Sequence, residues 1–190
     1  MEEDTRNLID EFKGLTNEEV VERLDEKRSA LEVAIYNVSH DFNAGTIVRN
    51  ANNFNVSCVH IVGRRKYNRR GAMCTDKYLT VKHWGDVQEF LSDQRARGRE
   101  MVAIENNVAN KYAEKFGQIE DKKFVKNTTL IFGSESDGLP EEILDGCDDI
   151  REISSYGSTR SVNVGVASGV AMYEWAKQIL HESLEDKAHE

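Results

Sequence analysis

The sequence predicts one α/β domain, with a mostly parallel β-sheet and helices on both faces. Short apolar runs rich in β-branched residues alternate with stretches of helical periodicity, which is typical of parallel strands joined by crossover helices. The 190 residues are enough to bury a single sizeable core. Because open parallel sheets bind ligands beyond the carboxyl ends of their strands, we expect the functional residues in the loops that follow the strands.

The chain opens with a helical extension, residues 1–30. Thr16 and Glu19 have the spacing of a capping box, so a polar helix is expected to begin there. Residues 31–183 form the main domain in this interpretation, and residues 184–190 form an acidic tail.

The main domain begins with a strand and a helix. Residues 31–38 (LEVAIYNV) are a β-branched apolar run suited to a buried strand, and residues 43–54 (NAGTIVRNANNF) have apolar side chains at helical spacing. Asn43 is a good N-cap, and this structural role alone would explain it. Arg49 shares the polar face with Gly45, which leaves space beside the guanidinium, although an exposed arginine is by itself ordinary surface.

The remaining elements follow from the same patterns. Further strands are expected at residues 57–63, 78–84, 100–106, 128–133 and 149–153. Further helices are expected at residues 86–98, 109–117, 140–146 and 161–181. Pro140 suits the first turn of its helix, and Gly98 and Gly146 suit helix ends.

The last predicted helix carries a glycine pair and an apolar stripe. Gly165 and Gly169 lie four residues apart, which indicates close packing against another helix or strand, either within the domain or across a dimer. The apolar stripe along this helix consists of Val162, Val166, Val170 and Tyr173.

The net charge of −9 comes from the two ends of the chain. Residues 1–26 carry a net charge of −7 and residues 181–190 carry −3, so the centre is nearly neutral. Around Tyr67 lies a basic cluster made of Arg64, Arg65, Lys66, Arg69 and Arg70. A second basic group is made of Arg95, Arg97 and Arg99. Basic side chains beside an aromatic ring suit an RNA backbone and a stacked base, but the same composition also fits a solvated loop.

Other classes of protein are disfavoured by what the sequence lacks. No apolar run approaches eighteen residues and no charged-then-apolar leader is present, so we expect a soluble, cytoplasmic protein without membrane contact. Cys58, Cys74 and Cys147 are far apart and odd in number, which argues against both disulfide bonds and a metal site. Glycine-rich phosphate loops and the G-x-S-x-G nucleophile turn are absent.

Two more polar loops follow predicted strands. Residues 132–140 (FGSESDGLP) form a glycine-flanked turn in which Glu135 either binds a cation or sugar hydroxyl or caps backbone N–H groups. Residues 153–163 end with Ser161 and Asn163 at the mouth of the last helix, and helix packing alone does not explain this pair.

Taken in order, three stretches resemble the motifs of the SpoU family of RNA ribose 2'-O-methyltransferases, members of the SPOUT superfamily. Residues 43–51 resemble the first motif, N-x-G-x-I-x-R-x-A. FGSESDGLP resembles the second, G-x-E-x-x-G-[LI], and SVNV at residues 161–164 resembles the third. Each motif alone is weak, but three in order are specific. The resemblance covers about residues 31–180.

The resemblance implies a fold, a cofactor and a set of site residues. The C-terminal part of the α/β sheet would be threaded into a deep trefoil knot, and the protein would be a homodimer that binds S-adenosyl-L-methionine in the knot. The cofactor would be held by Glu105, Gly133, Ile153 and Val162. The catalytic residue would be Arg49, with support from Asn43, Ser161 and Asn163.

The chemistry expected of Arg49 follows from its guanidinium group. A guanidinium stays protonated, so it is a poor general base but a good donor to the ribose 2'-oxygen or an adjacent phosphate. We therefore assign Arg49 the roles of orienting the 2'-hydroxyl and stabilising the charge that develops on it.

Three positions depart from the family pattern, two in the I-P-M stretch that usually precedes the third motif and one in the motif itself. Ser154 and Ser155 stand where the family has proline and methionine, and Val162 stands where leucine is usual. The alternative interpretation is therefore a non-catalytic RNA-binding or dimeric scaffold protein on the same fold. The helical extension and the basic cluster resemble accessory features of tRNA guanosine 2'-O-methyltransferases, which makes tRNA the first expected substrate, guanosine the favoured nucleoside and rRNA the second choice.

Overall fold

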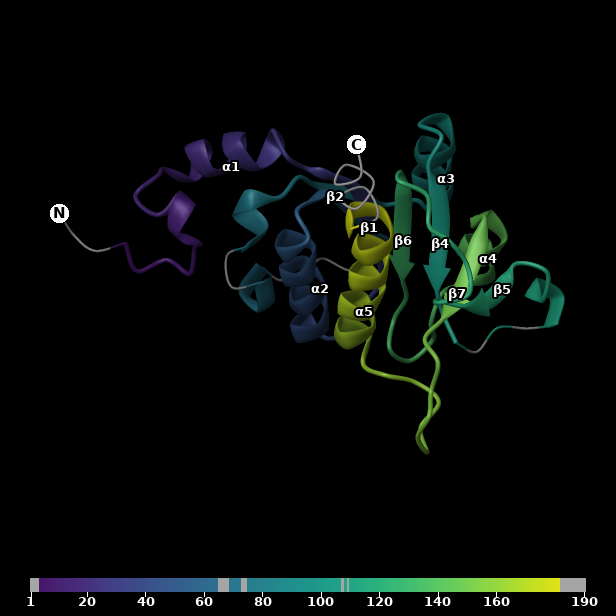
Figure 1. Ribbon diagram of the computed structural model, residues 1–190. Helices are drawn as coiled ribbons and strands as arrows, with labels where there is room; N and C mark the ends of the chain where they lie inside the picture. The colour runs from purple at the N-terminus through teal and green to yellow at the C-terminus, as the bar shows by residue number, and fades with distance from the viewer. Residues whose placement is uncertain (1–3, 65–68, 73–74, 107, 109, 182–190) are drawn as a thin grey trace, which may run out of the picture.

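A computed structural model describes residues 4–64, 69–72, 75–106, 108 and 110–181 of the chain. Within these residues seven strands form one parallel sheet in the order β3-β2-β1-β6-β4-β7-β5 (Figure 1). The strands are β1 Ser29–Tyr36, β2 Val56–Val62, β3 Val81–Trp84, β4 Glu100–Ile104, β5 Phe116–Gln118, β6 Thr128–Phe132 and β7 Asp149–Glu152. The predicted parallel α/β sheet is thereby confirmed.

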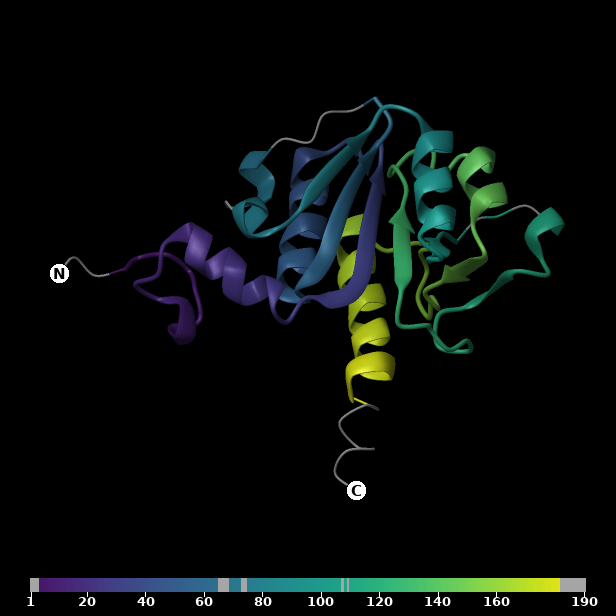
Figure 2. The ribbon, with the colours of Figure 1, turned by 90° about the horizontal axis from the view of Figure 1, so that it is seen from above.

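Helices cover both faces of the sheet (Figure 2). They are α1 Asn17–Asp25, α2 Asp41–Asn53, α3 Val87–Ala96, α4 Glu141–Gly146 and α5 Val164–Ala176. Along β1 the side chains alternate: Val33 and Ile35 join the core under α2 and α5, whereas Ala34 joins the core under α3 and α4. Because both faces are buried, the strand reads as a continuous apolar run.

The order of the strands places an opening between β1 and β6. From β1 the chain steps outward to β2 and β3, and it then returns to the other side of β1, where β6 pairs with both β1 and β4. Ligands of open parallel sheets bind at such a reversal, outside the carboxyl ends of the strands. The loops after β1, β6 and β7 all lie at this edge of the sheet.

The N-terminal segment packs into a small core of its own. Thr16 and Glu19 form the predicted capping box, with the Thr16 side chain accepting from the Glu19 N–H and the Glu19 carboxylate accepting from the Thr16 N–H. Phe12 and Val20 pack against Tyr78 of the short 3-10 helix η3 (Thr75–Tyr78), outside the two cores of the sheet. Figure 1 shows α1 set apart from the sheet.

The predicted helix at residues 109–117 is wrong. This segment contains one 3-10 turn, η4 (Asn110–Tyr112), followed by the edge strand β5, in which Phe116 pairs with Ile150 of β7. Pairing with a buried strand outweighs local helix propensity here, because it satisfies the backbone and covers the sheet edge. The predicted strand at 78–84 is shorter than expected, since its first residue belongs to η3.

The last helix begins later than predicted, at Val164, because Asn163 is its N-cap. The prediction of close packing at its two glycines is confirmed within the domain. A Cβ atom on Gly165 would lie 2.9 Å from the Thr46 Cβ of α2, and one on Gly169 would lie 3.2 Å from the Asn50 side chain. The α-helix is followed by a π-helical turn, Lys177–His181.

No helix in the described part of the chain is long and apolar enough to cross a membrane. Cys58 and Cys147 are buried free thiols, whereas Cys74 lies outside the described residues. Burial raises the pKa of Cys147 to about 12 and that of Cys58 to about 11, so neither thiol is a ready nucleophile.

Candidate functional site

Three loops meet at the carboxyl edge of the sheet through one chain of hydrogen bonds. Glu135, in the loop after β6, accepts from the Asn43 side-chain amide at 2.6 Å, from the Ser39 N–H at 2.8 Å and from the His40 N–H at 3.3 Å. Asn43 in turn accepts from the Asn163 side-chain amide at 2.9 Å. Polar side chains from three segments far apart in the sequence are therefore held in one place.

Asn43 is not the N-cap of α2, so that prediction is wrong. The helix begins at Asp41 with His40 as N-cap, and Asn43 lies within its first turn. This leaves both ends of the Asn43 amide free to join Glu135 and Asn163. Its position is thus explained by contacts across the site and not by capping.

The pKa of Glu135 is lowered. Partial burial works to raise it, but the hydrogen bonds from Asn43 and the Ser39 N–H outweigh that effect. The Glu135 carboxylate also lies against the N-terminus of α2, although Glu135 belongs to the loop after β6. The helix dipole therefore favours its negative charge. A carboxylate so well supplied with donors is a weak base, which suits positioning better than proton abstraction.

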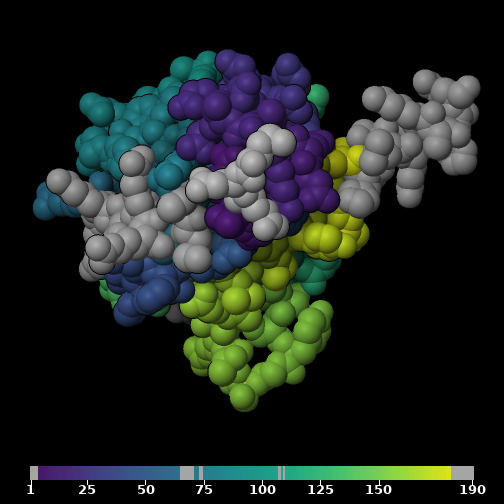
Figure 3. Space-filling view, turned by 90° about the vertical axis from the view of Figure 1, so that its left-hand side faces the viewer, coloured from purple at the N-terminus to yellow at the C-terminus, as the bar shows by residue number. Residues whose placement is uncertain are grey.

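A pocket of about 470 Å³ opens beside this chain of bonds, within the usual size range for small-molecule sites. Its lining includes all four residues predicted to hold the cofactor, Glu105, Gly133, Ile153 and Val162, and two of the predicted catalytic residues, Ser161 and Asn163. Figure 3 shows the loop after β7, which contributes to this lining, standing out from the body of the molecule.

Glu105 fixes the wall of the pocket. Its carboxylate accepts from the Leu139 N–H at 3.0 Å and from the Asn106 N–H at 2.9 Å. Gly138 stands against that carboxylate with a φ of +62°, so a larger residue there would have both a strained backbone and a clash. The loop after β6 is therefore tied to the end of β4.

The pocket is acidic. Its described lining contains four carboxylates, from Glu105, Glu135, Asp137 and Glu152, and no lysine, arginine or histidine. Such a lining favours a ligand with positive charge. S-adenosyl-L-methionine has a cationic sulfonium and an ammonium group, so the residues present fit this cofactor. Asp137 and Glu152 could not be recognised as pocket residues from the sequence, because single acidic residues in polar loops are common.

Arg49 is the one predicted catalytic residue outside this arrangement. It lies six residues beyond Asn43 on α2, or about 9 Å along the helix axis at 1.5 Å per residue. Its side chain is exposed, is absent from the pocket lining and has no hydrogen-bond or ion-pair partner among the described residues.

The space expected beside Gly45 does not exist, so that prediction is wrong. Gly45 is buried, and a Cβ atom there would run into the backbone of Gly71 in the 3-10 helix η2 (Arg69–Ala72). The glycine is required by this close approach of two backbones, and it does not provide room for a ligand.

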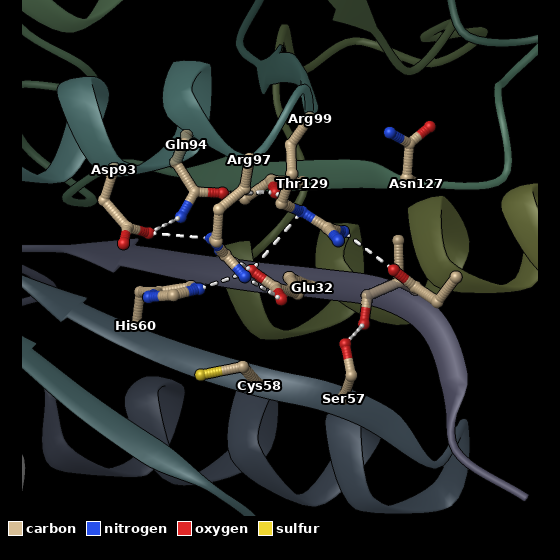
Figure 4. A network of polar contacts seen from close by, with 12 residues as sticks. Glu32, Ser57, Cys58, His60, Asp93, Gln94, Arg97, Arg99, Asn127 and Thr129 are labelled. Atoms are coloured by element: carbon tan, nitrogen blue, oxygen red, sulfur yellow. Dashed lines mark hydrogen bonds and ion pairs between the residues drawn. The ribbon is translucent and has the colours of Figure 1, made fainter.

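The predicted basic cluster is only partly described. Arg64 is exposed, Arg65 and Lys66 lie outside the described residues, and Arg69 and Arg70 are described as backbone of η2 only. In the second basic group Arg95 is exposed, and the other two arginines form ion pairs. Arg97 and Arg99 both pair with Glu32, whose side chain is buried between the sheet and α3 (Figure 4).

The sequence matches the model of a known family. The SpoU rRNA Methylase family model covers residues 30–173, most of the chain. The chain belongs to the SpoU methylase family. SpoU enzymes are RNA 2'-O-ribose methyltransferases that use S-adenosylmethionine.

Named relatives and solved structures agree with this family. A tRNA (guanosine(18)-2'-O)-methyltransferase of Aquifex aeolicus is 27% identical over 161 residues, which are 83% of this chain and 74% of the relative. The crystal structure of the A. aeolicus TrmH/SpoU tRNA modifying enzyme has a TM-score of 0.75 and 26% identity, covering 89% of this chain and 87% of that one.

Another solved structure that is similar to this chain concerns different nucleosides. It is described as giving insights into the 2-OH methylation of C/U34 on tRNA, and it has a TM-score of 0.68 and 25% identity, covering 80% of this chain and 97% of that one. This SpoU chain therefore resembles both guanosine-modifying and pyrimidine-modifying proteins at similar identity.

Proposed function

We propose that this SpoU protein transfers a methyl group from S-adenosylmethionine to the ribose 2'-hydroxyl of a guanosine in tRNA. The observation that carries the proposal is the chain of bonds from Glu135 through Asn43 to Asn163, beside an acidic pocket of suitable size. The named relatives that act on tRNA guanosine support the choice of substrate. Cytoplasmic location is part of the same proposal.

In this proposal one group of residues around the pocket binds the cofactor, and a second group positions the ribose. The cofactor supplies an activated methyl group. Glu105, Gly133, Ile153 and the backbone near Val162 would hold the cofactor, since all four line the pocket. Asn43, Ser161 and Asn163 would hold the ribose, and Glu135 would keep Asn43 in place.

Arg49 is proposed to act on the 2'-oxygen. A ribose hydroxyl is a poor nucleophile, so orienting it and favouring negative charge on its oxygen lowers the barrier. The guanidinium of Arg49 is exposed and has no described partner, which leaves its donors available to an RNA ribose or phosphate.

We also propose a homodimer formed through α5. Phe42 at the start of α2 is 83% exposed, Val162 just before α5 is 47% exposed, and on α5 Val166 is 56% and Tyr173 59% exposed. Exposed apolar patches of this kind mark interaction surfaces. Since Val162 also lines the pocket, a second copy on this stripe would lie at the pocket mouth, and we propose that its Arg49 serves that pocket.

The other predictions remain proposals. Family membership supports the trefoil knot in the C-terminal part. The division into residues 1–30, 31–183 and 184–190 is supported by the small separate core of the extension. Binding of the RNA backbone by Arg64, Arg65, Lys66, Arg69 and Arg70 is supported by their charge.

The experiment that tests the proposed reaction is transfer of a labelled methyl group to purified tRNA and, separately, to rRNA, followed by nucleoside analysis. We expect 2'-O-methylguanosine from tRNA. Methylation of a base instead of a ribose would contradict the proposal, and so would transfer to rRNA alone. Cofactor binding without transfer to either RNA would favour the scaffold interpretation.

A variant that fills the pocket tests whether methyl transfer depends on it, and a second variant of the same size is the control. Val162→Trp adds bulk at a half-exposed position of the lining, so it should abolish cofactor binding and transfer without disturbing the core. Val125→Trp places the same bulk at a similarly exposed valine away from the pocket, and it should behave as the unaltered protein does.

A further inference from the structure

A second cavity adjoins the cofactor pocket. It measures about 330 Å³ and is bounded by the end of β1, by Arg64 and by the loop after β6. Ser134, Asp137 and Gly138 line both hollows, so the loop after β6 forms a shared wall between them. A methyl acceptor must lie next to the methyl donor, which makes this cavity the natural place for part of the substrate.

The wall between the hollows is a rigid hairpin. The Ser134 N–H donates to the Gly138 carbonyl at 3.2 Å, and the Gly138 N–H donates back to the Ser134 carbonyl at 3.0 Å. The Ser134 hydroxyl accepts from the Asp137 N–H at 3.1 Å. The position of the Asp137 backbone is therefore set before any ligand binds.

The opposite side of the cavity is equally well fixed. Asn37 has a φ of +46°, and its side chain lies so close to Gly63 that a Cβ atom on Gly63 would be 2.5 Å from the Asn37 Oδ1. Gly63, with a φ of +96°, donates its N–H to the Trp84 carbonyl at 2.9 Å. The backbone that carries Arg64 is thus anchored to the ends of two strands.

Arg64 and Asp137 face this cavity with opposite charges, yet they form no ion pair with each other. The Arg64 side chain has no partner among the described residues, and the Asp137 carboxylate accepts one side-chain hydrogen bond, from Ser136 at 2.6 Å. A carboxylate has room for about four acceptor contacts, so most of its capacity is unused. The cavity therefore suits a ligand that brings both an anion and N–H donors.

We propose that this cavity binds the guanine nucleotide that is to be methylated, with Asp137 reading the base and Arg64 holding a phosphate. The inference rests on the proposed function and names the residues that choose its substrate. Guanine presents two adjacent donors, N1–H and N2–H, which match the two oxygens of a carboxylate. Adenine, cytosine and uracil each place an acceptor beside their donor on that edge, so none of them satisfies both oxygens.

Tyr36 adds a surface for the base. It ends β1, lines the cavity and is half-buried against the core under α3 and α4. An aromatic ring held in this way can stack on any base, so it contributes affinity, while the carboxylate contributes selectivity.

Binding of short RNA tests the proposal directly. Three pentanucleotides of uridine would carry guanosine, inosine or adenosine at the centre, and their affinities would be measured by fluorescence anisotropy. Inosine lacks the N2 amino group, so the unaltered protein should bind the guanosine strand at least about tenfold more tightly than the other two. Equal affinity for the three strands would overturn the proposal.

Asp137→Asn is the decisive variant, because it keeps the shape and replaces one acceptor oxygen by a donor. It should bind the guanosine strand no better than the inosine strand. Asp121→Asn, the same change at an exposed residue outside both hollows, should keep the preference. A preference for guanosine that survives in Asp137→Asn would overturn the assignment.

Arg64→Gln tests the phosphate contact. It should lower the affinity for all three strands by a similar factor, because a phosphate contact does not distinguish one base from another. It should also reduce the salt dependence of binding. Unchanged affinity and salt dependence would overturn this part of the proposal.

Methyl transfer measured in parallel separates the two proposals. Guanine-dependent binding without transfer to any RNA would leave the cavity assignment standing and overturn the proposed reaction. Ribose methylation of adenosine, cytidine or uridine by the unaltered protein would overturn the cavity assignment and the choice of guanosine, and it would leave 2'-O-methyl transfer to RNA standing.

Discussion

At the scale of single residues, Glu135 organises the site. Its carboxylate accepts three hydrogen bonds from the loop after β1 and the first turn of α2, and it does so across more than ninety positions of sequence. The sequence indicated that Glu135 matters but left open whether it binds a ligand or caps backbone groups. The structure shows that Glu135 accepts from two backbone N–H groups and from the Asn43 side chain, whose oxygen accepts from Asn163.

Replacing Glu135 should impair methyl transfer much more than stability. In Glu135→Ala the donors of Ser39, His40 and Asn43 lose their acceptor, so Asn43 is released from its position while the core stays intact. We expect kcat/KM to fall by about 10- to 100-fold, as for other losses of positioning contacts, with a small change in Tm. Glu142→Gln, which removes a charge from α4, is the control, and equal activities of the two variants would contradict this role.

Glu32 is a buried charged residue that belongs to none of the three motifs. Its side chain is 5% exposed, accepts from Arg97 at 2.8 Å and from the His60 Nε2 at 2.7 Å, and pairs with Arg99 at 3.3 Å (Figure 4). The His60 Nδ1 accepts from the Trp84 indole at 2.9 Å, so His60 is the neutral tautomer that donates through Nε2. Burial works to raise the pKa of Glu32, but these donors outweigh it and lower the pKa from 4.5 to about 2.

The lowered pKa of Glu32 predicts a pH dependence of stability. The folded state favours the ionised form, so the contribution is complete above pH 4.5 and is lost as the pH falls toward 2. Its size is about 3 kcal/mol, at about 1.4 kcal/mol per pH unit. Urea unfolding of the unaltered protein and Glu32→Gln should show a difference in unfolding free energy that shrinks between pH 5 and pH 3. A constant difference would contradict this account.

At the scale of elements, α2 lies between two close contacts. Gly45 meets the backbone of Gly71 on one side, and on the other side Asn50 donates to the Gly165 carbonyl at 3.0 Å and to the Ser168 hydroxyl at 2.9 Å. Apolar periodicity predicted α2, and the glycine pair predicted that some helix or strand approaches α5 closely, but the sequence did not say that this partner is α2. The partner of Gly45 could not be predicted, because contact with η2 depends on a segment with no periodic signal.

A methyl group at Gly45 should destabilise the protein. In Gly45→Ala the new carbon meets backbone atoms of Gly71, which cannot rotate away as a side chain can, so α2 or η2 must shift. We expect a loss of about 2–3 kcal/mol or more, measured by urea unfolding. Gly85→Ala is the matched control, since nothing lies within 4 Å of its Cβ position, and similar losses in both variants would show that the contact is unimportant.

At the scale of the whole molecule, the sheet could be predicted from sequence better than its edge strands and its site geometry. Central strands such as β1 and β6 are buried on both faces and read as apolar runs, whereas β5 has three residues and takes its structure from pairing with β7. The second and third motifs contain most residues of the pocket lining, whereas the first motif contains none of them. The motifs could not reveal that Arg49 lies outside the pocket, because a motif gives the position of a residue in the sequence and not the distance of its side chain from the pocket.

The exposed stripe predicts that the molecule functions as a dimer. Val166→Asp puts a charge at the centre of the stripe, at a position 56% exposed in the single chain, so the chain should still fold. Light scattering should then show a monomer for Val166→Asp and a dimer for the unaltered protein, and methyl transfer should be lost in the variant. Val125→Asp, at a valine 43% exposed away from the stripe, should remain dimeric, and a Val166→Asp dimer would contradict the proposed interface.

The most direct test of the central claim is the methyl-transfer rate of Arg49→Ala, measured with tRNA beside the unaltered protein and Arg95→Ala. Arg49 lies outside the pocket and supports no fold contact among the described residues, so cofactor affinity and stability should not change. We predict that kcat/KM falls at least about 100-fold in Arg49→Ala and stays unchanged in Arg95→Ala. Transfer by Arg49→Ala at the rate of the unaltered protein would contradict the assignment of Arg49 to the reaction.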